Sequence, residues 1–155
     1  MLDRQQLHLI HGRVPVCSYP VSTSRYGAGC EQDSRRTPTG MHHIAEKIGQ
    51  GCERGEILKA RVATGEIAEI IAAEEPGDED LITSRILWLQ GMEPGINQGE
   101  GVDSYQRYIY IHGSNEEGLI GQPASVGCIR MKNDDVIDLF DRVEVGTPVL
   151  IIGRP

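Results

Sequence analysis

The sequence contains no long apolar run and no segment that resembles an export leader. Its hydrophobic residues occur in short runs, far below the roughly 20 residues that a membrane-spanning helix needs. The N-terminus, Met1 to Gln6, leads directly into alternating apolar residues, without the basic region and apolar stretch of a signal peptide. We therefore expect no membrane span and a cytoplasmic protein, or an extracytoplasmic one if a leader has been removed.

Positive charge is scarce. Lys and Arg total 15 against 23 Asp and Glu, which gives a formal net charge of −8. Nucleic-acid binding needs clustered Lys and Arg to neutralise phosphates, so the composition argues against a nucleic-acid partner. Seven acids and no base lie between Glu66 and Asp80. We interpret this segment as a solvated surface loop, because it lacks the alternating acidic pattern of a calcium-binding loop.

Cysteine pairs at metal-binding or redox spacing are also absent. The four cysteines are Cys17, Cys30, Cys52 and Cys128, and no two of them form a C-x-x-C motif. This spacing argues against zinc-ribbon and thioredoxin-like sites, and we expect free thiols. The sequence predicts neither a bound metal nor a cofactor.

The residues that are abundant favour a mainly β fold. The chain has 155 residues with 19 Gly and 8 Pro, which fits one domain over residues 1–155 with many turns. The pattern predicts strands over 84–89, 105–112 and 147–152, and a hairpin over 6–24 with its turn at Gly12. Residues 25–40 are predicted to be a loop, and residues 41–84 give no clear pattern.

One short helix is predicted in the C-terminal half. Asn133 would be its N-cap, followed by an acidic first turn. Val136, Ile137, Leu139, Phe140 and Val143 have the spacing of one apolar helical face, and Gly146 would end the helix.

Two segments carry residues with chemical potential. The first, 111–115, contains His112 at the end of a predicted strand, and the second, 125–131, contains Cys128. A thiol becomes a strong nucleophile when a neighbouring base favours the thiolate, so Cys128 is the candidate nucleophile and His112 its base. The carbonyl of Gly113 could hold one ring N–H and fix the tautomer. Gly127 would let a substrate approach the backbone and leave N–H groups free to bind an oxyanion.

Packing alone would also account for a cysteine and a histidine in these places. Cysteine is commonly buried in cores, so the pair by itself indicates catalysis only weakly. Arg130 has two readings as well: it could bind a substrate carboxylate or form a structural ion pair.

The order and spacing of these residues resemble a known family. His-Gly-x-Asn from His112, followed 16 positions later by Cys128 within Ser-x-Gly-Cys-Ile-Arg-Met-x-Asn, is similar to the signature of YkuD-type L,D-transpeptidase catalytic domains. The resemblance continues through residues 133–149 and includes 19–23 and 37–40, so it covers nearly the whole chain. Many members have His where this chain has Val126, and this departure puts in doubt any substrate contact of that His.

The resemblance implies an L,D-transpeptidase-like β-sandwich or barrel that acts on peptidoglycan stem peptides. Cys128 would attack the bond between an L-centre and D-Ala, with His112 as base and the Gly113 carbonyl orienting it. Ser125, Gly127, Arg130 and Tyr110 would line the substrate or oxyanion side. The partner would be a stem peptide or murein fragment, and a carbapenem-type inhibitor would acylate Cys128.

The acceptor of the acyl group is a separate question. Water would give an L,D-carboxypeptidase that trims recycled tetrapeptides, and an amine would give an L,D-transpeptidase that forms 3→3 cross-links. The absence of a leader in this sequence favours water over the amine. The alternative class is a catalytically silent domain that only binds peptidoglycan fragments.

Overall fold

The computed structural model describes residues 1–154, and strands dominate it. The elements in chain order are η1 (Leu2–Arg4), β1 (Gln6–His11), β2 (Val14–Ser22), β3 (Gly40–Ile48), β4 (Glu56–Lys59), β5 (Val62–Ile67), β6 (Ile82–Gly91), β7 (Tyr110–Ser114), η2 (Glu117–Leu119), β8 (Ile129–Met131), α1 (Asn133–Arg142) and β9 (Pro148–Ile151). η1 and η2 are single turns of 3₁₀-helix, and α1 is the only α-helix within the described residues. The predicted fold class, mainly β with one short helix in the C-terminal half, is confirmed.

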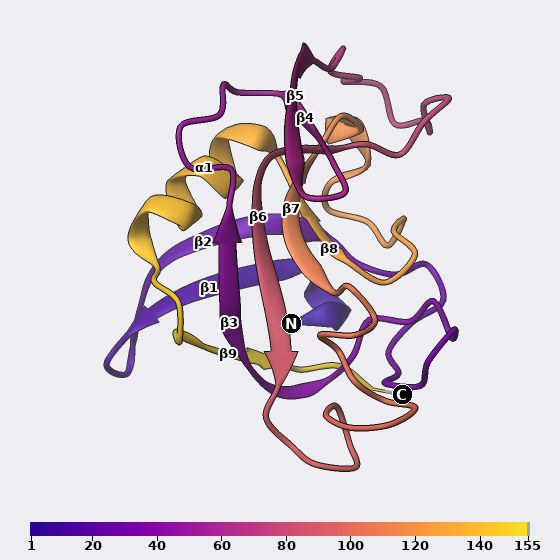
Figure 1. Ribbon diagram of the computed structural model, residues 1–155, viewed down its shortest axis with the longest axis vertical. Coiled ribbons are helices and arrows are strands. Elements are labelled where there is room, and N and C mark those ends of the chain that lie inside the picture. The colour runs from indigo at the N-terminus through magenta and orange to yellow at the C-terminus, as the bar shows by residue number, and fades with distance from the viewer. Residues whose placement is uncertain (155) are drawn as a thin grey trace.

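All nine strands belong to one strongly curved sheet. Its order is β1-β2-β8-β7-β6-β3-β9, and β4 joins it by pairing with both β5 and β6 (Figure 1). The pair β7–β8 is parallel and the other strand pairs are antiparallel. Because a parallel pair needs a crossover, the chain leaves β7, passes through η2 and a loop, and returns beside β7 to form β8.

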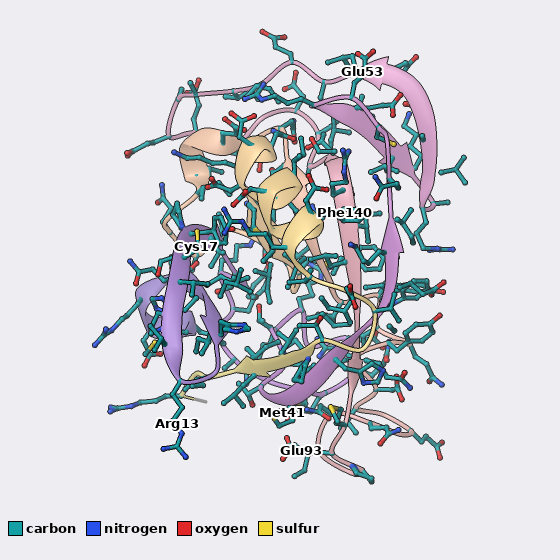
Figure 2. The ribbon with its side chains drawn as sticks, turned by 90° about the vertical axis from the view of Figure 1, so that its left-hand side faces the viewer. Arg13, Cys17, Met41, Glu53, Glu93 and Phe140 are labelled. Atoms are coloured by element: carbon teal, nitrogen blue, oxygen red, sulfur yellow. The ribbon has the colours of Figure 1, made fainter. Side chains whose placement is uncertain are left out.

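The terminal predictions are confirmed with small shifts of boundary. β1 and β2 form an antiparallel hairpin that turns at Gly12, whose φ of 65° suits glycine. The predicted helix is α1, which buries Val136, Leu139 and Phe140. It lies against β6 and β7, between the β1–β2 hairpin and the long central strands (Figure 2).

The strand predicted over 105–112 is partly wrong. Strand β7 begins only at Tyr110, and residues 104–108 form turns. Asp103 explains the difference, because its carbonyl accepts the Arg107 N–H and its carboxylate accepts the Gln106 N–H. These bonds close a turn that the aromatic and β-branched composition of the segment does not reveal. Tyr108 completes it with a φ of 56°.

The N-cap prediction for Asn133 is also wrong. Lys132 occupies the cap position, and Asn133 is the first residue of the helix with its side chain fully buried. The helix N-terminus is capped from outside instead, because Glu117 Oε1 accepts the Asn133 N–H at 2.8 Å. Strands β3, β4 and β5 occupy the part of the chain, 41–84, for which the sequence gives no clear prediction.

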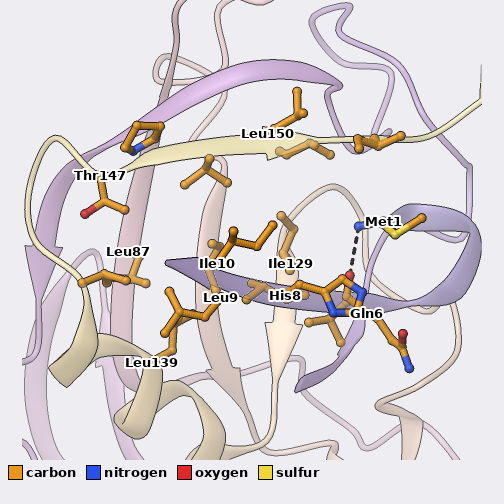
Figure 3. A pocket seen from close by; sticks show the side chains of 18 of the residues that line it. Met1, Gln6, His8, Leu9, Ile10, Leu87, Ile129, Leu139, Thr147 and Leu150 are labelled. Atoms are coloured by element: carbon orange, nitrogen blue, oxygen red, sulfur yellow. Dashed lines mark hydrogen bonds between the residues drawn. The ribbon is translucent and has the colours of Figure 1, made fainter. Parts of the chain in front are cut away.

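A cavity of about 360 Å³ lies between the β1–β2 hairpin and β9. In Figure 3, Leu150 of β9 is on one side of it and Leu9 and Ile10 of β1 are on the other. Ile129 of β8 also lines this cavity, whereas Cys128 and His112 do not. Among residues 1–154, no helix has the length and apolar character required to cross a bilayer.

Candidate active site

Cys128 lies directly before β8, beside the first residue of β7. The Tyr110 N–H donates to the sulfur at 3.4 Å, and the thiol donates to the Tyr108 carbonyl at 3.3 Å. The cysteine is half-buried and packs against a small cluster that contains Trp88 and Tyr110. The backbone at the start of β7 therefore holds the sulfur at a fixed position.

His112 lies on the same face of the sheet as Cys128. Ile111 pairs with Ile129 across the parallel strands β7 and β8, and both point into the main hydrophobic core. Side chains alternate along a strand, so the neighbours of these two isoleucines point to the opposite face. His112 and Cys128 are thus brought to one face of two adjacent strands. Within residues 1–154, the hydrogen bonds of the sulfur are to backbone groups and not to the imidazole.

The tautomer of His112 is fixed by its own neighbour. Nδ1 of His112 donates to the Gly113 carbonyl at 2.6 Å, the hydrogen bond expected from the sequence. A carbonyl oxygen only accepts, so Nδ1 carries the proton and Nε2 of the neutral ring is the basic nitrogen. Burial lowers the pKa of His112, and the hydrogen bond to Gly113 opposes this only in part. The imidazole is therefore neutral and able to accept a proton at neutral pH.

The thiol of Cys128 is also neutral at rest. Removal of the sulfur from water raises its pKa to about 11, although the N–H of Tyr110 and the guanidinium groups of Arg107 and Arg130 favour the thiolate. A preformed thiolate–imidazolium pair is thus disfavoured both by the raised pKa of Cys128 and by the lowered pKa of His112. Any nucleophilic attack by this sulfur must transfer its proton during the reaction.

The turn before Cys128 is held by side chains. Ser125 Oγ donates to the Cys128 carbonyl at 2.6 Å and accepts the Gly127 N–H at 3.3 Å. Thr37 Oγ1 donates to the Gly127 carbonyl at 2.9 Å. Gly127 has a φ of 137°, which is strained for any other residue. Of the N–H groups expected to bind an oxyanion, that of Gly127 is bonded to Ser125, whereas that of Cys128 makes no hydrogen bond within residues 1–154.

Ser125 and Arg130, both expected on the substrate or oxyanion side, are buried and make hydrogen bonds within the protein. The Ser125 side chain is buried, and its hydroxyl makes its hydrogen bonds within the turn. Arg130 is 1% exposed and donates to Glu116 at 2.6 Å and to Asp80 at 3.0 Å. Both acids contact Nη1, so Arg130 forms an ion pair, whereas its buried Nε and Nη2 have no hydrogen-bond partner within residues 1–154. Asp80, from the acidic segment, is not a free surface charge.

An aromatic wall borders the cysteine, and the sequence did not reveal it. The Trp88 ring stacks on Tyr105 with centroids 4.1 Å apart and meets the edge of Tyr110 at 5.4 Å. Tyr108 lies at 5.7 Å from the same ring. Tyr110 thus supports the wall with its ring and the sulfur with its N–H. The tyrosines at 105, 108 and 110 are visible in the sequence, but only the turn at Asp103 brings them around Trp88.

Together these features define a mainly β domain with a cysteine and a neutral histidine on one face of a parallel strand pair. The YkuD model, which describes the L,D-transpeptidase catalytic domain, matches residues 2–151. The chain belongs to this family of enzymes.

Known relatives agree with this assignment. The probable L,D-transpeptidase ErfK/SrfK of Salmonella typhimurium is 55% identical over 49 residues, which are 32% of this chain and 16% of that protein. The fold is similar to an L,D-transpeptidase C442S mutant of Enterococcus faecium, with a TM-score of 0.56 and 18% identity over 97% of this chain and 47% of that one. It is also similar to an L,D-transpeptidase in complex with imipenem, with a TM-score of 0.53 and 18% identity over 97% of this chain and 56% of that one. The chain thus spans a sixth to just over half of these proteins.

Proposed function

We propose that this domain cleaves the bond between an L-centre and D-Ala in a peptidoglycan stem tetrapeptide, through an acyl-enzyme on Cys128. The observation that carries the proposal is the His112–Gly113 hydrogen bond at 2.6 Å, which leaves Nε2 unprotonated on the face that Cys128 shares. Membership of the L,D-transpeptidase family and the names of its relatives support the choice of substrate.

The proposed first half-reaction forms a thioester. Cys128 Sγ attacks the carbonyl carbon while His112 Nε2 takes the thiol proton, directly or through one water. The new oxyanion would accept a hydrogen bond from the Cys128 N–H, which makes none within residues 1–154. The C–N bond then breaks, and His112 returns the proton to the departing amine of D-Ala. The thioester and free D-Ala are the products.

The second half-reaction depends on the acceptor. Attack by water, assisted by His112, gives a tripeptide and restores the thiol. Attack by an amine gives a new amide bond and the same thiol. We propose water as the main acceptor, with a cytoplasmic site of action, and transfer to an amine as its rival.

A silent peptide-binding domain is the second candidate, and one observation favours it. The raised pKa of Cys128, about 11, leaves the sulfur protonated at rest, as expected of an inert buried cysteine. The two candidates differ in whether Cys128 ever becomes acylated.

Mass spectrometry of the purified protein with a stem tetrapeptide tests the proposal. We expect release of D-Ala, formation of tripeptide and complete loss of both in Cys128→Ala. An added D-amino acid would yield an exchange product if amines compete with water. Imipenem, which is bound in one of the related structures, should add its mass to the wild type and not to Cys128→Ala. Unchanged D-Ala release by Cys128→Ala would refute the nucleophile, and a protein that imipenem does not label and that releases no D-Ala would be the silent domain.

A further inference from the structure

The turn of the β4–β5 hairpin places a cation over the aromatic wall. Lys59 pairs with Val62, so Ala60 and Arg61 form a two-residue turn. Both have left-handed backbone angles, with φ of 47° and 65°, although neither is a glycine or an asparagine. This tight turn is held in a conformation that is unfavourable for its residues, and it directs Arg61 toward the wall.

Arg61 contacts three side chains of the aromatic wall. Its guanidinium lies 5.0 Å from the Trp88 ring centroid and 5.5 Å from that of Tyr108. Its Nη1 donates to the Tyr110 hydroxyl at 3.2 Å. Within residues 1–154 it forms no ion pair, and its remaining N–H groups make no hydrogen bond. A half-buried arginine with unused donors and no acid partner is suited to receive a carboxylate.

The same residues connect Arg61 to the reactive sulfur. Tyr110 holds Arg61 by its hydroxyl and Cys128 by its N–H. The guanidinium of Arg61 lies over the Tyr108 ring, and the Tyr108 carbonyl accepts a hydrogen bond from the Cys128 thiol. The arginine therefore contacts the side chains of Tyr108 and Tyr110, and the cysteine contacts the backbone of the same two residues. A peptide whose carbonyl reaches Cys128 would extend across this wall.

Arg61 also differs from the two cations near Cys128, Arg107 and Arg130. Arg107 donates to the carbonyls of Gly29 and Arg36, so its charge fastens a loop. Arg130 is enclosed by Glu116 and Asp80. Arg130 also has unused donors, Nε and Nη2, but these are fully buried, whereas the Arg61 side chain is only half-buried.

We propose that Arg61 is a specificity-determining residue that binds a carboxylate of the acyl-donor peptide. This proposal rests on the proposed function. The carboxylate could be that of the C-terminal D-Ala or the one on the side chain of the third stem residue, and both would form the same forked pair with a guanidinium. The stacking on Trp88 and Tyr108 would keep the guanidinium plane fixed before the substrate arrives.

The test compares Arg61→Gln with Lys59→Gln, which removes a positive charge from the exposed, adjacent position of the same hairpin. For D-Ala release, Arg61→Gln should raise KM about tenfold with little change in kcat, as expected for a lost charge-assisted hydrogen bond. Lys59→Gln should leave both constants unchanged. Arg61→Lys should recover part of the loss, since it keeps the charge and not the fork.

Amidated substrates separate recognition from a merely structural role. Against a tetrapeptide whose relevant carboxylate is amidated, wild type and Arg61→Gln should have the same KM, because the partner of the arginine is gone. If the two KM values become equal with the C-terminal amide, Arg61 binds the D-Ala carboxylate. If they become equal with the side-chain amide, Arg61 binds the carboxylate of the third stem residue. A KM ratio that persists with both amides would overturn the proposal, as would an equal effect of Lys59→Gln.

Binding without turnover keeps this inference separate from the chemistry. Calorimetry with the Cys128→Ala background should show that Arg61→Gln weakens tetrapeptide binding about tenfold. If the wild type releases no D-Ala and this difference in Kd remains, the proposed reaction fails and the carboxylate site stands. If D-Ala is released and the variants bind equally, the carboxylate site fails and the reaction stands.

Discussion

At the residue scale, the properties of Cys128 and His112 determine how any reaction depends on pH. Burial raises the pKa of the thiol to about 11 and lowers the pKa of the imidazole. The reactive form is then the neutral pair, in which His112 accepts the proton as the sulfur attacks. This form exists from below the usual histidine pKa, about 6.5, up to the pKa of the thiol.

Acylation of Cys128 by imipenem should therefore be level from pH 7 to about 9 and fall in acid, with a midpoint below about 6.5. Stopped-flow measurement of the acylation rate gives the profile. His112→Gln should slow the reaction by about 10²-fold or more at neutral pH, as loss of a general base does, and its rate should rise with pH toward 11. A preformed thiolate–imidazolium pair would instead lose activity in alkali as the imidazolium deprotonates, so a rate that falls between pH 7 and about 9 would contradict the neutral pair.

Arg130 is the residue whose role the sequence left open, and its ion pair predicts a large cost of substitution. Its partners Glu116 and Asp80 lie 14 and 50 positions away, so the buried pair cannot be read from the local pattern. Arg130→Met would leave the buried Glu116 carboxylate without its cation, and we expect a loss of about 3–5 kcal/mol in the free energy of unfolding.

Urea unfolding of Arg130→Met, Glu116→Gln and the double variant measures this coupling. The double variant should be more stable than Arg130→Met, because the uncompensated charge is gone. Equal stability of the double variant and Arg130→Met would mean that the pair adds nothing beyond packing. Tetrapeptide binding should be retained wherever the variant folds, in contrast to Arg61→Gln.

At the element scale, the Asn133 side chain joins the helix to strands β6 and β7. Its Oδ1 accepts the hydroxyls of Thr83 and Ser84 at 2.6 Å each, and its Nδ2 donates to the Ser114 carbonyl at 2.9 Å. Asn133→Ala would leave these buried groups without partners. We expect a loss of about 3 kcal/mol in the free energy of unfolding, measured by urea denaturation. Asp141→Ala, an exposed change on the same helix, should stay within about 0.5 kcal/mol. A similar small effect of Asn133→Ala would contradict the role of this side chain as a junction.

The elements that the sequence predicted are those whose signal is local. The β1–β2 hairpin has a glycine turn, and α1 has an apolar face at helical spacing. Strand β5 gave no such signal, because all six of its residues are exposed and Gly65 interrupts it. Strand β3 buries His42, which a hydrophobic pattern does not mark as interior, and Ser104 supplies its partner from 62 positions away.

The site shows the same division between local and distant causes. The His112–Gly113 contact joins neighbouring residues and could be predicted from sequence. The roles of Ser125 and Gly127 depend on a turn closed by Thr37, 90 positions from Gly127. The aromatic wall depends on Trp88 reaching Tyr105, and Arg61 arrives from a hairpin in a segment that the sequence left unassigned. The sequence thus indicated the residues next to the cysteine in the chain, but not the distant residues that surround it in the fold.

At the scale of the whole molecule, the parallel pair β7–β8 separates two environments. One face carries the main core with Ile111 and Ile129, and the other carries Cys128, His112 and Arg130. The reactive side chains therefore lie on the face of the sheet opposite the main core, where ionisable groups are buried. The pH dependence of stability is the global consequence of that burial.

His42 and His112 are both buried as neutral rings, and burial lowers the pKa of each. The unfolded chain binds protons at these histidines at a higher pH than the native state does, so stability rises with pH across that window. It should be complete above about pH 6.5 and decline between pH 6.5 and 5, by up to about 1.4 kcal/mol per pH unit for each histidine. The usual pKa values of Asp and Glu side chains, about 4, lie below this range. Urea unfolding at pH 7.5, 6.5, 5.5 and 5.0 measures the slope.

His42→Gln should make that slope about half as steep, because one of the two buried imidazoles is removed. Its absolute stability will also fall, since the ring accepts from Ser104 at 2.8 Å and donates to the Gly40 carbonyl at 3.0 Å. Only the slope is therefore compared. His11→Gln, an exposed change in the β1–β2 hairpin, should leave the slope as it is in the wild type. A wild-type free energy of unfolding that stays constant from pH 7.5 to 5 would show that both imidazoles can be protonated without loss of the fold. Any loss of acylation in acid would then arise from protonation at the Cys128–His112 pair and not from unfolding.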